Sequence, residues 1–310
     1  MKAVVYDRFG PPDVLTIQEL PDPPAQSDRV RVQVYAAALN PKDVLIRKGK
    51  MRWSIGGRLP RTPGYDIAGV LLDDAPGLPE GTPVYGMIQD HMGGGCAEIV
   101  SLPMDQIAQK PASLSMAEAA SLPLAGLTAL QGLRDELLLQ DGETVLLNGA
   151  SGGVGTLAVQ MAKAMGATVW AVCSTRNAAL VESLGAERVI DYTETSLDTL
   201  RDLDKIYDIY GSFPWHRAKA SLKPGGRYCT TIPTAGTALR GALRRVGLHQ
   251  AALVVVRSRR PDLDQMRQMV DAGTLRPLIE SVVSFADSAA GHRQLETRRT
   301  RGKVVVQIRD

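Results

Sequence analysis

The 310-residue sequence predicts an α/β fold, in which a β-rich domain is followed by a doubly wound parallel sheet. Two observations predict it. The first third reads as short strands separated by Pro and Gly, and from about residue 115 apolar strands alternate with helical segments. The length also exceeds what one hydrophobic core usually supports, which favours two domains.

The β-rich part begins with a strand and a turn at the N-terminus. It continues with RVRVQVYAA (29–37), which follows the turn-forming segment PDPPAQSD (21–28). Further strands are predicted at 66–72, 82–87 and 97–102. Because strands this short must bury one another to be stable, we expect a small module closed on itself.

A helical region at 115–133 opens the second part, and Pro123 is expected to kink or split it. TVLLNG (144–149) then reads as a buried strand. The apolar residues that follow fall on one stripe of a 3.6-residue helix, and Gly166 is expected to cap its C-terminus. The stripe consists of Val154, Leu157, Ala158, Met161, Ala162 and Met165.

Five more apolar strands follow this helix, with another helix predicted at 178–185. Six buried strands separated by helices are the pattern of a Rossmann sheet. The segments after residue 260 lie outside this repeat, and we expect them to return to the β-rich module. The expected domains are 1–115, 116–258 and 259–310, the last completing the first. The five strands are predicted at 168–173, 188–192, 205–211, 226–232 and 251–256.

The glycine-rich loop NGASGGVG (148–155) lies between the first of these strands and its helix, where dinucleotide-binding proteins hold a pyrophosphate. The strict G-x-G-x-x-G pattern fails, because Ala150 stands in the first glycine position. Its physical requirements survive, since Gly152 and Gly153 let backbone approach a phosphate and Gly155 lets the helix pack on the strand. The predicted phosphate site consists of Ala150, Ser151, Gly152, Gly153 and Val154.

The end of the next strand favours NADPH over NADH. An NAD site usually places an acid there to bind the ribose 2′-hydroxyl, but AVCSTRNAAL (171–180) contains none. Ser174, Arg176 and Asn177 stand there instead, and a hydroxyl with a guanidinium suits a 2′-phosphate. The alternative is that Arg176 is an exposed turn residue.

Composition and charge exclude several classes of partner. The net charge of +3 is too small to argue for nucleic acid. No apolar run approaches the ~18 residues needed to span a bilayer. The N-terminal segment has no apolar signal-peptide core, so we expect no membrane association and a cytoplasmic location.

The number and spacing of the cysteines and histidines argue against both a disulfide framework and a zinc site. Cys96, Cys173 and Cys229 are odd in number and widely spaced, so they are expected to be ordinary thiols. The histidines are isolated in sequence, and surface or structural roles are expected for them. They are His91, which is close to a glycine-rich loop, His216, His249 and His292.

Six segments, in order along nearly the whole chain, resemble the medium-chain dehydrogenase/reductase superfamily and more closely its zinc-free quinone oxidoreductase branch. The resemblance implies a GroES-like β domain plus a Rossmann domain, a small-molecule substrate and a homodimer. The segments are LNPKDVLIRKG (39–49), PGYDIAGV (63–70), GGGCAEIV (93–100), AGLTALQGL (125–133), NGASGGVG (148–155) and LGAERVIDY (184–192).

The resemblance also implies that no metal is bound. Zinc-dependent members place a Cys ligand where this chain has Asn40, and a His-Glu pair where it has Tyr65 and Asp66. Their lobe of four cysteines has no counterpart between residues 87 and 96. Without a Lewis acid, hydride from NADPH must go to an acceptor that is already electrophilic, such as a quinone or an α,β-unsaturated carbonyl.

Four further residues follow from the matched segments. Asn40 is implied to lie beside the nicotinamide and to donate to the acceptor oxygen. Lys42 stands where zinc-dependent relatives carry the Ser or Thr of a proton relay. Our hypothesis is that Lys42 stabilises or protonates the enolate or quinol anion, the alternative being a solvated lysine. Thr128 and Tyr192 match cofactor contacts, with a helix-internal hydrogen bond and strand-end packing as their respective alternatives.

These observations predict a zinc-independent NADPH-dependent oxidoreductase that reduces a quinone or a similar activated carbonyl. One alternative is an NADPH-dependent ene-reductase acting on the C=C bond of an enone, alkenal or biosynthetic enoyl intermediate. A second is a non-catalytic NADPH-binding sensor or structural protein. Leu45 gives the second slight support, because it replaces a tyrosine that relatives often carry on the substrate side.

Overall fold

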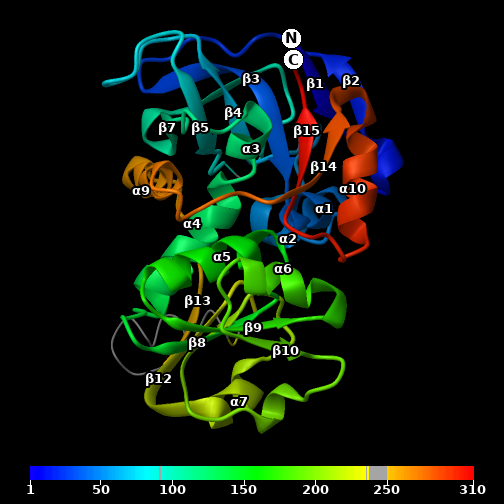
Figure 1. Cartoon of the computed structure of the whole chain (residues 1–310). Helices are drawn as coiled ribbons and strands as arrows, with labels where there is room; N and C mark the ends of the chain where they lie inside the picture. Colours follow the sequence, from blue (N-terminus) through cyan, green and yellow to red (C-terminus); the bar gives the residue numbers. More distant parts are fainter. Residues whose placement is uncertain (91, 235, 237–249) are drawn as a thin grey trace. The chain divides into compact units, whose positions relative to one another are not determined.

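The computed structural model describes residues 1–90, 92–234, 236 and 250–310. These residues form two compact units. Unit 1 consists of Met1–Leu124, Arg257–Gly273 and Pro277–Asp310, and unit 2 of Ala125–Val256 and Thr274–Arg276. The chain therefore leaves unit 1 for unit 2 and then returns to unit 1, which the colours of Figure 1 show from blue through green to red.

Unit 1 is built on a β-sheet whose order among the described residues is β14-β15-β3-β4-β5-β7, with β6 also paired to β3. A separate hairpin is formed by β1 and β2. The strands are β1 (Lys2–Val5), β2 (Thr16–Glu19), β3 (Arg29–Leu39), β4 (Asp66–Leu71), β5 (Pro83–Met87), β6 (Ile99–Pro103), β7 (Ile107–Gln109), β14 (Ile279–Ser284) and β15 (Lys303–Gln307).

Strand β3 organises this sheet, because its two halves pair with different neighbours. Its first half, from Arg29, pairs with β6, and its second half, to Leu39, pairs with the C-terminal strand β15. Burial alternates along the first half and becomes continuous in the second, where both faces are covered. The C-terminal segment thus completes the sheet that the N-terminal residues begin.

The helices of unit 1 cover this sheet. Helix α3 lies against β3 and β4, and α10 lies beside β14 and β15 (Figure 1). The Tyr85 hydroxyl in β5 donates to the Leu263 carbonyl of α9 at 2.6 Å, which holds α9 on the sheet edge. These helices are α1 (Pro41–Arg47), α2 (Arg52–Ile55), α3 (Met116–Ala120), α9 (Arg260–Asp271) and α10 (Ser288–Glu296).

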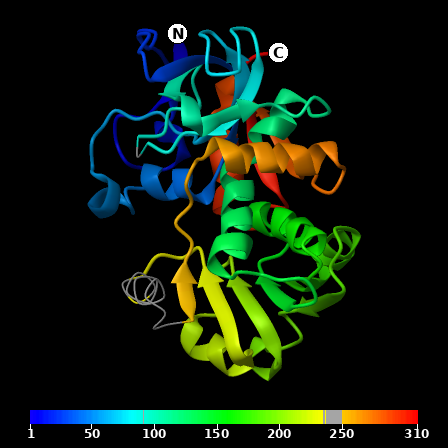
Figure 2. The same ribbon diagram turned by 90° about the vertical axis from the view of Figure 1, so that its left-hand side faces the viewer.

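Unit 2 holds a parallel sheet with the strand order β10-β9-β8-β11-β12-β13 among the described residues. This is the order of the predicted Rossmann fold, in which the first strand is central and the order reverses beside it. Figure 2 shows β11, β12 and β13 side by side with their arrowheads at one end. The strands are β8 (Thr144–Asn148), β9 (Thr168–Cys173), β10 (Arg188–Asp191), β11 (Leu203–Asp208), β12 (Leu222–Thr230) and β13 (Ala251–Leu253).

Helices cover both faces of the unit 2 sheet. Successive side chains of a strand point to opposite faces, and neighbouring residues of β11 contact different helices. Ile206 of β11 packs with Phe213 and Ala218 near α7. Its neighbour Tyr207 points the other way, where its hydroxyl donates to the Thr128 carbonyl of α4 at 2.7 Å. Among the described residues, the α-helices of unit 2 are α5 (Gly153–Ala164), α6 (Ala178–Ser183), α7 (Trp215–Ala218) and α4 (Pro123–Gln131), the last of which begins in unit 1 and belongs to unit 2 from Ala125.

The structure confirms most predicted elements, but the expected domain boundaries after residues 115 and 258 lie after Leu124 and Val256, and Thr274–Arg276 belongs to unit 2. Pro123 splits the helical region at 115–133, since α3 ends at Ala120 and α4 begins at Pro123. Gly166 follows α5 with a φ of +82°, as expected of a C-terminal cap. Helix α3 was expected in the second domain, but it lies in unit 1 because its small residues pack on β3 and β4.

Candidate functional site

Helix α1 begins with the sequence Asn40-Pro41-Lys42-Asp43, which is suited to start a helix. Pro41 stands at the first helical position, where a missing N–H costs nothing. The Asp43 carboxylate accepts the Asn40 N–H at 2.9 Å, which satisfies a backbone donor at the helix start. Lys42 therefore lies in the first turn of α1, between Pro41 and Asp43, and the local sequence fixes both of these residues.

The same Asp43 joins helix α1 to the segment that precedes β4. Its second oxygen accepts the Gly64 N–H at 2.7 Å. Gly64 has a φ of +95°, and a Cβ there would lie 2.8 Å from the Cys96 backbone nitrogen, so only glycine fits. This contact brings together the two segments that carry Lys42 and Tyr65, and the Lys42 Nζ lies 3.8 Å from the centroid of the Tyr65 ring.

A buried hydrogen-bonded cluster lies beside this pair and joins the start of α1 to β4, β15 and the start of α4. The Lys303 ammonium donates to Asn40 Oδ1 at 2.5 Å and to Asp66 Oδ2 at 3.0 Å. The Asn40 amide donates to the same Asp66 oxygen at 2.9 Å. The other Asp66 oxygen accepts the Leu124 N–H at 2.6 Å. Every member that supplies a side chain is nearly inaccessible to water.

Burial shifts the pKa values of the groups around Lys42. Removal from water lowers the pKa of Lys42, and the nearby Asp43, Asp66 and Asp90 oppose this only in part. Burial raises the pKa of Asp43 to about 6, although two backbone N–H bonds favour its charged form. A lysine with a lowered pKa releases a proton more readily than an exposed one, which suits a proton donor.

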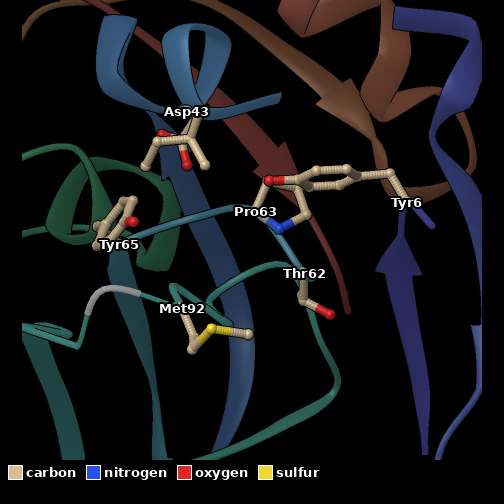
Figure 3. Close-up of a pocket in the computed structure, with 7 residues that line it drawn as sticks. Tyr6, Asp43, Thr62, Pro63, Tyr65 and Met92 are labelled. Carbon is tan, nitrogen blue, oxygen red and sulfur yellow. The ribbon is translucent and has the colours of Figure 1, made fainter. Parts of the chain in front are cut away.

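A small pocket opens next to these residues (Figure 3). It encloses about 170 Å³, part of it open to solvent. Figure 3 shows Tyr6 and Tyr65 on opposite sides of Pro63. Burial raises the pKa of Tyr6 to about 12, so its phenol stays protonated near neutral pH. The pocket is lined by Tyr6, Asp43, Ile46, Thr62, Pro63, Tyr65 and Met92.

The structure places Asn40 and Lys42 differently. Asn40 is 3% exposed, and its amide group donates to the Asp66 carboxylate and, at 3.3 Å, to the Ala38 carbonyl. Lys42 is half-buried, and its Nζ contacts the Tyr65 ring. It forms no ion pair with another described residue. Of the two residues, Lys42 therefore has the more available donor.

In unit 2 the glycine-rich loop forms the turn from β8 into α5, as predicted. Gly152 is the N-terminal cap of α5. A Cβ on Gly155 would lie 2.1 Å from the Gly149 carbonyl oxygen, so this glycine lets the helix approach the strand. A Cβ on Gly152 would instead meet only the Gly149 oxygen, at 3.6 Å. Space for a phosphate thus remains beside Gly152, at the positive end of the helix.

The residues expected at the adenosine end gather at the carboxyl ends of β9 and β10. Asn177 closes the short helical turn η4 (Thr175–Asn177), and its amide donates to the Ser151 hydroxyl at 2.9 Å. Asn177 Oδ1 is buried and has no hydrogen-bond partner among the described residues. Arg176 is exposed on the same turn. Tyr192 is 60% exposed, and its N–H donates to the Cys173 carbonyl at 3.3 Å.

Asp191, which the sequence reasoning did not select, lies at this end of the sheet. Its carboxylate accepts the Thr175 hydroxyl and the Thr193 N–H, the latter at 2.8 Å. The hydrogen bond from Thr175 is the largest cause of a lowered pKa for Asp191. The strand pairing of Asp191 with Cys173 was the available signal, because it brings the end of β10 beside the turn after β9.

The remaining expected cofactor residue, Thr128, lies in α4 and is 7% exposed. Its carbonyl accepts the Tyr207 hydroxyl, so α4 is held on the sheet at this point. Gly132, one turn further, leaves room for the Tyr207 ring, from which a Cβ would be only 2.4 Å away. Thr128 is therefore fixed relative to β11.

The structure describes all three cysteines and two of the four histidines. Cys96, Cys173 and Cys229 are free and buried. Among the described residues, no three His, Cys, Asp or Glu side chains are grouped to hold a metal ion. His216 is exposed and His292 is fully buried, whereas His91 and His249 lie outside the described residues. Within the same ranges, no helix combines the length and apolar character needed to cross a membrane.

Two family models match the chain. The model described as "Alcohol dehydrogenase GroES-like domain" matches residues 26–112. The model described as "Zinc-binding dehydrogenase" matches residues 184–306. The first match lies in unit 1, whereas the second begins at Leu184, directly after α6 of unit 2, and ends in β15.

Curated proteins and solved structures match the chain over nearly its whole length. A 2-methylene-furan-3-one reductase from Solanum lycopersicum is 36% identical over 99% of this chain and 79% of its own. A chloroplastic NADPH-dependent alkenal/one oxidoreductase from Arabidopsis thaliana is 35% identical, with the same coverage. A quinone oxidoreductase structure from Coxiella burnetii superposes with a TM-score of 0.91 and 32% identity, over 100% of this chain and 99% of the other.

Proposed function

The chain belongs to the medium-chain dehydrogenase/reductase superfamily, in its quinone oxidoreductase branch, and from this we propose how it works as an oxidoreductase. We propose that it transfers hydride from NADPH to a quinone or a similar activated carbonyl acceptor, without zinc. One observation carries the proposal. The Lys303 ammonium is hydrogen-bonded to Asn40 and Asp66, which stand where the resemblance places two zinc-site residues of zinc-dependent relatives.

This ammonium supports a zinc-independent reaction on electrostatic grounds. It already supplies the positive charge that balances the Asp66 carboxylate, and it occupies the Asn40 carbonyl oxygen. A divalent cation bound to the same oxygens would have to displace or repel a buried ammonium. The acceptor would then need to be electrophilic on its own, which quinones and enones are.

Residues of unit 2 fit a dinucleotide. The space beside Gly152 and the free amides at the start of α5 suit a pyrophosphate. The unpaired Asn177 oxygen accepts a donor such as a ribose hydroxyl. Ser174 and Arg176, on the adjacent turn, support NADPH over NADH, and Tyr192 would flank the adenosine. When bound, the nicotinamide would supply the hydride.

Lys42 would complete the reaction on the acceptor. Hydride addition leaves negative charge on the acceptor oxygen, and an ammonium beside it stabilises that charge or gives it a proton. Lys42 suits this role because it is half-buried with a lowered pKa. Thr128 and Asn40 would act around the nicotinamide, Asn40 through the orientation that Lys303 and Asp66 impose on it.

A test of this function starts from a matched panel of acceptors. NADPH oxidation is followed with para-quinones, alkenals and cyclic enones, and NADH is compared with each. We expect Lys42→Met to lower kcat on the preferred acceptor roughly 10²-fold, as for a lost proton donor. Lys50→Met removes an exposed lysine from the turn that follows α1 and serves as the control. Unchanged turnover of the Lys42 variant would refute its role.

The ene-reductase alternative is supported by two relatives, one named a reductase of 2-methylene-furan-3-one and one an alkenal/one oxidoreductase. Turnover of enones with no turnover of any quinone would establish it. Tight NADPH binding without turnover of any acceptor would instead favour the non-catalytic sensor. One stoichiometric zinc per chain, by elemental analysis, would refute the zinc-independent mechanism.

Two further expectations rest on the resemblance and composition alone. We propose a homodimer, which light scattering coupled to size exclusion would test. The cytoplasmic location expected from the sequence stays a prediction, and cell fractionation would test it.

A further inference from the structure

We propose that Tyr65 is a positioning residue, whose ring face holds the Lys42 ammonium where it meets the acceptor oxygen. The proposal rests on the function of Lys42 given above. It assigns a task to the aromatic side chain that stands at a position where zinc-dependent relatives carry a metal ligand. In this chain, the Tyr65 ring at this position would hold the Lys42 ammonium instead of a metal ion.

The contact has the geometry of a cation–π interaction. Lys42 Nζ lies 3.8 Å from the centroid of the Tyr65 ring, well inside the ~6 Å limit for such pairs. A lysine side chain has four flexible methylenes and would otherwise extend into water. The ring therefore supplies the attraction that keeps the half-buried ammonium inside the site.

The ring itself is fixed on several sides. Tyr65 is 2% exposed, and its carbonyl accepts the Ile88 N–H at 2.7 Å. The preceding Gly64 is tied to Asp43, so the backbone segments that carry Lys42 and Tyr65 are linked by one hydrogen bond. Figure 3 shows the Tyr65 ring at the edge of the pocket, on the segment between Pro63 and β4.

The neighbouring carboxylates cannot replace the ring in this task. Both Asp43 oxygens accept backbone N–H groups, from Asn40 and Gly64. Asp66 is paired with Lys303, and Asp90 is exposed. The three acids favour the charged form of Lys42 through space, whereas Tyr65 is its direct contact among the described residues.

Three variants at Tyr65 and Lys42 test the proposal through kcat. Tyr65→Phe keeps the ring and should retain most of the turnover. Tyr65→Leu removes the ring and should lower kcat about tenfold, the order of a partly desolvated cation–π contact. In a Lys42→Met background, Tyr65→Leu should lower kcat no further, because the two residues act as one unit. Equal losses from Phe and Leu, or additive losses with Lys42→Met, would overturn the proposal.

A readout that does not depend on activity separates this proposal from the proposed function. In protein labelled with ¹³C-lysine, the Lys42 ε-methylene resonance should be shifted upfield by the ring current and is identified by its loss in Lys42→Met. The shift should persist in Tyr65→Phe and vanish in Tyr65→Leu. If the wild type shows the upfield shift but Lys42→Met is fully active, the contact is established and only the catalytic role of Lys42 is refuted. A resonance without this shift in the wild type would refute the positioning role itself.

Tyr6→Leu is the matched control, because Tyr6 lines the same pocket with a second buried phenol. It removes a ring of the same size without touching the Lys42 contact. Its effect on kcat should therefore add to that of Lys42→Met, and the Lys42 resonance should keep its upfield position. A Tyr6 variant that abolishes the shift would show that the pocket as a whole, and not the Tyr65 ring, positions Lys42.

Discussion

The Lys303 ammonium lies 3.0 Å from the Asp66 carboxylate, and both side chains are buried in unit 1. Lys303 begins the last strand, β15, and Asp66 begins β4, so the pair joins two strands that are remote in sequence. Both strands flank β3 in the sheet. The charge of Asp66 is balanced at this site by a residue 237 positions away.

Lys303→Met should destabilise the protein, because it leaves the Asp66 carboxylate buried without its counter-charge. Removing one partner of a buried pair typically costs about 3–5 kcal/mol, which a urea-unfolding midpoint would report. The double variant Lys303→Met/Asp66→Asn removes both charges and should recover much of this loss. A single variant that costs less than about 1 kcal/mol would show that the pair is not stabilising.

Gly155→Ala and Gly152→Ala should have different effects, although they are three residues apart. A Cβ on Gly155 would clash with the Gly149 carbonyl at 2.1 Å, so this variant should unfold at lower temperature. A Cβ on Gly152 would have its nearest contact at 3.6 Å, so this variant should keep its melting temperature and bind NADPH more weakly. Equal NADPH affinity of Gly152→Ala and wild type would remove the pyrophosphate from this position.

Arg176→Ala should weaken NADPH far more than NADH, because only NADPH carries the 2′-phosphate. The loss should be roughly 1.5–3 kcal/mol for a charge-assisted contact, and titration calorimetry with each cofactor would measure it. Arg201→Ala removes another exposed arginine of unit 2 and is the control. Similar losses for NADPH and NADH would assign the 2′-phosphate to other residues.

His292 should make the protein less stable below neutral pH. Burial, and then the Arg47 charge, lowers its pKa from 6.5 to about 3. As the pH falls through 6.5 the unfolded chain therefore takes up a proton that the folded chain refuses, and stability is lost down to about pH 3. Between pH 7 and pH 5 this amounts to roughly 2 kcal/mol.

The His292→Asn variant isolates this contribution. Arg47 Nε donates to His292 Nδ1 at 3.4 Å, and an asparagine oxygen can accept in its place. Asp43 acts in the opposite sense, because its folded pKa of about 6 lies above 3.8, but it is present in both proteins. Urea unfolding at pH 7 and pH 5 should show a smaller loss for the variant. Equal losses would mean that His292 is protonated in the folded state.

Local patterns in the sequence were sufficient to predict the parallel sheet. Apolar runs recur along unit 2, the first of them is followed by an amphipathic helix, and each predicted strand is present there. The glycine at position 155 was predictable because close packing of a helix on a strand has few solutions. The position of α3 was not, since its small residues could pack on either side of the boundary.

The candidate site could be predicted only in part. Asn40 and Lys42 were selected by resemblance, but their partners Lys303 and Tyr65 were not, because no local pattern marks a buried lysine or a ring beneath an ammonium. Asp191 was not predicted, because it ends the third strand, whereas an NAD site usually places its acid at the end of the second. Its proximity to Thr175 depends on the pairing of β10 with β9.

The sequence by itself determined the order of strands and helices, the glycine-rich turn and the predicted cofactor residues after β9. These features depend on neighbours along the chain. Only the tertiary structure decided what Asn40 can do. Its amide is engaged by Asp66 and its oxygen by Lys303, which leaves Lys42 as the available donor. The physical reason is that a polar group buried between a strand and a helix must be satisfied by whatever the fold brings beside it.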